Sequence, residues 1–298
     1  MGILQTARAG ILFLLPGGRV ERILLSYLLL LNCALLVWRP AGLWLPALAL
    51  HCAMAAAILW LAQTARRPSS GILHFLFHWY PQLCFLFFFE EVELLVHMIH
   101  PGWFDRYIMQ FDLYWFRVHP ALWLEQHAAP WLTEIMQGCY FSFYLMLPGV
   151  GGLLYFRRRW QEFELLMTAA AVGYTTCYGI FYLFPVEGPY HTLAPFYRGE
   201  LVGGFFDSLM AQIETSGRVH GGAFPSTHVV GTFVPWLTAW RYLPKLAWGM
   251  TPFVVGMLLA TIYGRYHYVA DILAGIVVAF IAFEAARRFR SAKAMSYH

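Results

Sequence analysis

Long apolar segments alternate with short polar ones along almost the whole chain. Eight of the apolar segments approach the roughly 20 residues that a bilayer-spanning helix needs. They cover about 22–38, 43–62, 72–99, 131–156, 165–184, 226–243, 246–264 and 268–286. The pattern predicts an all-α fold, a polytopic membrane helical bundle with about eight transmembrane helices.

We expect a single membrane domain over residues 1–298, because no low-complexity linker interrupts the chain. N-terminal helices and an outer interfacial segment are expected over about 1–160, and the core helices over about 165–286. Two long connections, about 100–130 and 185–225, fall on the predicted outer side.

Composition and charge agree with a membrane protein. The 298 residues are 60% hydrophobic and only 12% charged, which is too apolar for a soluble domain of this length. Because cytoplasmic loops carry excess Lys and Arg, the 20 basic residues test the topology. A cytoplasmic N-terminus leaves only six of them outside: Arg39, Arg106, Arg117, Arg198, Arg218 and Arg265. Both termini are therefore expected to be cytoplasmic, and the net charge of +4 requires no nucleic-acid partner.

The two long connections differ in character. The first, about 100–130, mixes aromatic and charged residues and predicts amphipathic segments at the membrane interface, which could form a lid or an access route for lipid. A plain aromatic belt is an equally good interpretation. The second, about 185–225, begins with Pro185 and ends with Gly221 and Gly222, so we expect a shaped loop that carries function.

Three acidic residues lie near the outer end of the third apolar segment: Glu90, Glu91 and Glu93. Ionisable groups at membrane depth are costly and are usually paired or functional. We favour a structural pairing with an arginine such as Arg117 or Arg198 over a catalytic role.

The first candidate motif runs from Gly221 to His228. Ser226 or Thr227 can cap the helix that follows, and the amide-rich helix start attracts an anion such as phosphate. Gly221 and Gly222 let the preceding backbone approach a ligand closely. A Ser-Thr cap alone is common, so this motif indicates an anion site only in combination with the second.

The second motif contains Arg265, His267 and Asp271. Residues four apart share a helix face, so the Asp271 carboxylate can orient the His267 imidazole and leave its other nitrogen free to attack. Arg265 offers a forked donor for phosphate oxygens. The five cysteines, by contrast, show no metal-ligand spacing.

Together the two motifs resemble the second and third signatures of the type-2 phosphatidic acid phosphatase superfamily. In that family a Pro-Ser-Gly-His segment is followed by a His and an Asp four residues apart and then Leu-Ala-Gly. The matching residues here are Pro225-Ser226-Thr227-His228 and His267-Tyr268-Val269-Ala270-Asp271-Ile272-Leu273-Ala274-Gly275. The resemblance implies that His267 attacks phosphorus to form a phosphohistidine, that Asp271 orients it and that His228 protonates the leaving oxygen.

The chain also departs from the family pattern. The first signature, a Lys followed by six residues and then Arg-Pro, is missing, and Thr261 stands where the third has an arginine. The pattern is closer to the branch of inositol phosphorylceramide synthases and related bacterial proteins, which implies a bacterial inner (plasma) membrane. The distribution of basic residues predicts that the two motifs, and hence the active site, are extracytoplasmic. The candidate phosphate-binding residues are Ser226, Thr227, Arg265, Arg218 and Arg198.

Two enzymatic functions fit these residues. One is a lipid phosphatase that hydrolyses a phosphate ester or diphosphate, and the other is a phosphotransferase that moves a phospho-headgroup to a lipid or polyol hydroxyl. A non-catalytic lipid-binding protein is a third interpretation, which the retained His and Asp residues argue against. No cofactor or metal is implied, because only Asp271 among carboxylates lies in the core motifs, and activity is expected to persist in chelator. The lipid and the oligomeric state stay open.

Overall fold

The computed structural model describes residues 18–65, 71–217 and 219–295, and these residues are almost entirely helical. They form no β-sheet, and one isolated bridge joins Val186 to Gly222. Seven of the helices are long and apolar enough to cross a membrane: α1 (Arg19–Trp38), α2 (Trp44–Ala65), α3 (Ile72–Leu95), α6 (Pro130–Phe156), α7 (Trp160–Leu183), α11 (Pro244–Tyr263) and α12 (Val269–Met295). The predicted all-α polytopic bundle is confirmed.

The eighth predicted span, 226–243, corresponds to α10 (Thr227–Tyr242), which is not among these seven helices. Its 16 residues rise only about 24 Å at about 1.5 Å per residue, less than the roughly 30 Å of a bilayer core. Seven of the eight predicted spans therefore correspond to helices long and apolar enough to cross a membrane in the described part of the chain, and α10 is shorter than these seven.

The chain forms two compact units, one ending at Phe88 and the other beginning at Phe89. In the first unit α1 packs against α2. A ring nitrogen of His51 lies 2.6 Å from the side-chain oxygen of Asn32, so a polar contact joins the two helices inside the apolar layer.

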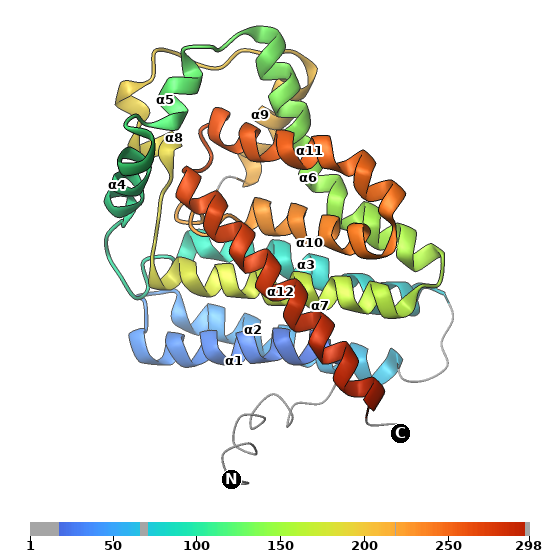
Figure 1. The fold of residues 1–298 in the computed structure, drawn as a ribbon. Coiled ribbons are helices and arrows are strands. Elements are labelled where there is room, and N and C mark those ends of the chain that lie inside the picture. Colours follow the sequence, from blue (N-terminus) through green and yellow to red (C-terminus); the bar gives the residue numbers. More distant parts are fainter. Residues whose placement is uncertain (1–17, 66–70, 218, 296–298) are drawn as a thin grey trace, which may run out of the picture. The chain divides into compact units, whose positions relative to one another are not determined.

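α10 lies at the centre of the second unit, packed against α6, α7, α11 and α12 (Figure 1). Most of its side chains are buried against these helices, which accounts for its apolar composition. Its start lies close to α12: a Cβ on Gly275 would fall 2.8 Å from the carbonyl oxygen of Ser226. Glycine at 275 therefore permits the close approach of the two helices that carry the candidate motifs.

Shorter helices connect the spans. They are α4 (Asp105–Phe116), α5 (Pro120–Glu125), α8 (Pro189–Thr192), the 3₁₀ turn η2 (Ala194–Phe196) and α9 (Phe205–Gly217). In α4 the buried residues Asp105, Ile108 and Asp112 follow helical spacing, whereas Tyr114 and Trp115 are exposed. The predicted amphipathic segment is thus helical and one-sided, and its role as a lid or lipid route stays a prediction.

Candidate active site

Three predicted residues meet where α10 and α12 begin, and we call these candidate catalytic residues the trio (His228, His267 and Asp271). Nε2 of His267 lies 3.0 Å from Nδ1 of His228, and Nδ1 of His267 lies 3.4 Å from Oδ2 of Asp271. His267 is 2% exposed and Asp271 is fully buried. The structure thus brings together two motifs that are 39 residues apart.

Backbone hydrogen bonds hold the trio in place. The N–H of Tyr268 donates to Oδ2 of Asp271 over 2.8 Å, and the N–H of Ser226 donates to the Asp271 carbonyl oxygen over 3.1 Å. The N–H of His267 donates to the carbonyl oxygen of Thr261. The first motif is therefore bonded directly to the second, which limits how far the two histidines can separate.

A buried tyrosine extends the trio on the side of His228. The Tyr140 oxygen, on α6, lies 2.8 Å from Nε2 of His228. The Tyr140 ring also stacks on Tyr266 with centroids 4.3 Å apart. Tyr140 lies in an apolar run without any motif, so nothing in the sequence marked it.

These contacts fit one direction of hydrogen bonding. If the Asp271 carboxylate accepts from Nδ1–H of His267, then Nε2 of His267 accepts from Nδ1–H of His228. Nε2 of His228 in turn accepts from the Tyr140 hydroxyl. In this arrangement the lone pair of His267 is on Nε2, the tautomer that a nucleophile requires, and it accepts from His228.

Burial and the neighbouring His228 lower the pKa of His267 well below its ordinary value of 6.5. A carboxylate beside an imidazole raises its basicity, but burial is the largest influence on the pKa of His267. A lowered pKa keeps the imidazole neutral, and hence nucleophilic, at neutral and mildly acidic pH.

We predict that His267 takes up a proton only below about pH 6.5. Titration of ¹⁵N-histidine-labelled full-length protein in detergent micelles, with the His267→Gln variant used for assignment, checks this directly. A midpoint at or above the ordinary histidine value would contradict the burial seen here.

Ser226 caps α10 as predicted. Its Oγ accepts the N–H of Val229 over 3.2 Å, and both Ser226 and Thr227 are buried. Phosphate binding by these two residues stays a prediction.

The predicted phosphate-binding arginines have other contacts. Nη2 of Arg265 donates to Oε1 of Glu125 over 2.9 Å and to the Gly199 carbonyl oxygen over 2.7 Å, and the guanidinium lies 3.8 Å from the Tyr197 ring centroid. Arg198 donates its backbone N–H to the same carboxylate. Arg218 lies outside the described residues. The two side-chain hydrogen bonds of Arg265 use Nη2 alone, and a role for Arg265 on phosphate stays a prediction.

Glu93 pairs with a histidine. Its carboxylate accepts the backbone N–H of His220 and lies 3.1 Å from the ring Nδ1 of that residue. The predicted pairing with Arg117 or Arg198 is therefore not the one that Glu93 makes.

Two buried aspartates of α4 hold the loops around the trio. Oδ1 of Asp112 accepts the N–H of Ala270 and Oδ2 accepts that of Val269, which satisfies free amides at the start of α12. Asp105 accepts four hydrogen bonds, from the backbone N–H of Glu187 and Gly188 and from the hydroxyls of Thr192 and Tyr268. The only sequence signal was that Asp105 lies three residues before the apolar Ile108 and Asp112 lies four residues after it, so that all three share one helical face.

Removing the Asp105 carboxylate is expected to destabilise this part of the protein. The Asp105→Ala variant leaves buried donors unsatisfied, at about 1–3 kcal/mol for each, and we expect a lower melting temperature together with reduced turnover. Asp105→Asn keeps one acceptor oxygen and should fall between the variant and the parent. Thermal unfolding in detergent measures both, and an unchanged alanine variant would show that these bonds contribute nothing.

A cavity of about 530 Å³ lies beside the segment that leads into His267, although none of the trio lines it. Its lining includes Gln137, Asp207 and Glu214, together with Arg265 and Tyr266 from the second motif. The Tyr266 hydroxyl donates to Glu214. Polar groups therefore line a space next to the loop that carries His267.

Comparison with known proteins agrees with this geometry. A family model described as PAP2 superfamily matches residues 106–285, more than half of the chain. A PA-phosphatase related-family protein of Dictyostelium discoideum is 27% identical over 122 residues, which are 40% of this chain and 22% of that protein. The chain thus spans about a fifth of that relative, and no solved structure gives a significant match. With its seven candidate membrane spans and its joined His and Asp motifs, the chain belongs to the PAP2 superfamily.

Proposed function

We propose that the protein is an integral-membrane lipid phosphatase that hydrolyses a phosphate ester or diphosphate through a phosphohistidine on His267. Family membership and membrane-spanning helices support a membrane lipid phosphatase-type protein. The observation that carries the finer proposal is the line of contacts from Asp271 through His267 to His228.

In the first step Nε2 of His267 attacks phosphorus, and the bond from phosphorus to the lipid oxygen breaks. The anionic substrate favours the protonated form of His228, which gives its proton to the leaving oxygen. Nδ1–H of His267 stays directed at Asp271, whose negative charge stabilises the positive phosphoimidazole. Asp271 is thus a positioning residue.

In the second step His228, now neutral, takes a proton from water, and the water oxygen attacks phosphorus. Inorganic phosphate leaves, His267 is restored and His228 is protonated again. The two steps consume one lipid phosphate and one water and yield a lipid alcohol and phosphate.

Rapid acid-free quenching with a ³²P-labelled lipid phosphate tests this mechanism. We expect label on the protein that survives alkali and is lost in acid, and its absence from the His267→Gln variant. Label at another residue, or turnover without any labelled intermediate, would overturn the mechanism.

The polar cavity favours a second candidate, a phosphotransferase. Asp207, Glu214 and Gln137 offer acceptors for the hydroxyls of an acceptor molecule beside the His267 loop. Product analysis with and without lipid or polyol alcohols separates the two. A phosphorylated acceptor formed without phosphate release would replace the phosphatase proposal.

We also propose an extracytoplasmic active site in a bacterial inner membrane, supported by the basic residues that gather in the opposite set of loops. Turnover of a membrane-impermeant substrate by intact spheroplasts tests this. Activity that appears only after permeabilisation would place the site inside.

The reaction needs no metal in this scheme, because the trio supplies nucleophile and proton donor. We predict that turnover after exhaustive treatment with EDTA stays within about two-fold of the untreated rate, measured as phosphate release in the same detergent. A loss that added Mg²⁺ restores would contradict the mechanism.

A further inference from the structure

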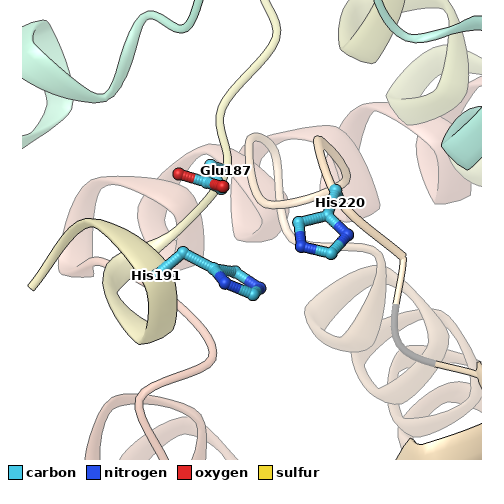
Figure 2. A group of neighbouring side chains, drawn as sticks. All are labelled: Glu187, His191 and His220. Carbon is cyan, nitrogen blue, oxygen red and sulfur yellow. The ribbon is translucent and has the colours of Figure 1, made fainter. Parts of the chain in front are cut away.

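Glu187, His191 and His220 converge outside the trio. Each offers one ligand atom, and these atoms all lie within 4.8 Å of one another. Figure 2 shows the three side chains turned toward the same space, two from the segment after α7 and one from the segment before α10. All three are partly buried, so an ion from solvent can reach them.

The fold holds these two segments side by side. The N–H of Ala223 donates to the carbonyl oxygen of Val186, and Val186 pairs with Gly222. Asp105 fixes the neighbouring backbone through the N–H of Glu187. The positions of Glu187 and His220 are therefore set by hydrogen bonds that do not involve their side chains.

The two histidine rings also lie together, with centroids 4.2 Å apart. His220 presents its Nδ1 to Glu93, which leaves Nε2 on the other side of the ring, toward Glu187 and His191. A carboxylate on one imidazole nitrogen with a metal on the other is the usual arrangement of metal-binding histidines, since the carboxylate orients the ring and raises its basicity.

We propose that Glu187, His191 and His220 form a Zn²⁺ site, with Glu93 orienting His220. Two imidazole nitrogens and one carboxylate are a ligand set typical of zinc with one open position, whereas Mg²⁺ prefers oxygen ligands alone. Zinc bonds of about 2.0–2.1 Å in a tetrahedron place ligand atoms about 3.3 Å apart. Small side-chain movements from the observed separations reach that geometry.

Sequence spacing hid this site, because the glutamate and the second histidine are 33 residues apart. Zinc here would join the loop after α7 to the segment that leads into Pro225 and His228. None of its ligands belongs to the trio, although His191 also lines the cavity beside Tyr266. Metal binding, rather than turnover, is therefore the measurement that tests the site.

Zinc titration of the purified, chelator-stripped full-length protein in detergent tests the proposal. We expect one zinc ion per chain by calorimetry, with metal retained after dialysis. The His191→Ala and His220→Ala variants should bind at least about 100-fold more weakly, a greater loss than the about 10–100-fold expected for Glu93→Gln. His127→Ala, which removes an exposed histidine outside the cluster, should bind like the parent.

Parent protein that binds no more zinc than the His191→Ala/His220→Ala double variant would overturn the proposal. Cobalt substitution gives a second readout that needs no variant. Stripped parent protein loaded with Co²⁺ should show intense visible absorption from a four-coordinate site, and a weak six-coordinate spectrum would equally overturn the assignment.

Discussion

The His267→Ala variant is expected to lose at least about 10⁴-fold in turnover of lipid phosphate, because it removes the atom that bonds to phosphorus. Nε2 of His267 already lies 3.0 Å from the proposed proton donor, and no other imidazole is described at that position. Phosphate release by purified protein in detergent is the measurement, with His127→Ala as the matched histidine control.

Measuring lipid binding by the His267→Ala variant distinguishes an enzyme from a lipid-binding protein. A His267→Ala variant that binds the lipid as the parent does, but does not turn it over, supports the enzyme. If the parent turns over no lipid phosphate and the variant binds equally well, the protein is a lipid-binding member of the family. Retained turnover in the variant would require a different nucleophile.

The Asp271→Asn variant is expected to lower kcat by about 10³–10⁴-fold with a much smaller change in KM. The corresponding change in Ser-His-Asp enzymes leaves the geometry intact but favours the wrong imidazole tautomer. Here Oδ2 of Asp271 faces both the Tyr268 N–H and Nδ1 of His267. An asparagine that keeps its oxygen at this position loses the negative charge, whereas one that turns its amide N–H₂ to this position donates to Nδ1 of His267. The lone pair would then move to Nδ1, away from the substrate.

An altered protein structure is the main competing explanation for such a loss of kcat. An unaltered melting temperature for Asp271→Asn, together with unchanged binding of a non-hydrolysable lipid phosphonate, would exclude it. A loss of kcat that is accompanied by a lower melting temperature would mean that Asp271 acts mainly through its contacts with Tyr268 and Ser226.

Much of the fold could be predicted from hydrophobicity, because a bilayer requires long apolar helices and seven of the eight predicted spans are present. The short length of α10 and its burial could not be predicted, since a helix buried within the protein is as apolar as one that faces lipid. Burial by α6, α7, α11 and α12, rather than lipid, accounts for its composition.

Part of the candidate site could likewise be predicted from the sequence, and part could not. His267 and Asp271 could be paired from their spacing, because four residues make one helical turn and that contact is local. Tyr140, Asp105 and Glu125 could not be placed, since each contacts the motifs across more than 80 residues of chain.

By itself, the sequence determined the all-helical membrane architecture and the chemical nature of the trio, which depend on composition and on local spacing. Only the tertiary structure decided that His228 lies against His267, that Arg265 is paired with Glu125, and that Glu187, His191 and His220 share one space. The physical reason is that the packing of α10 against α12 and the bonds of the Asp105 carboxylate bring distant segments together, and no local pattern records such contacts.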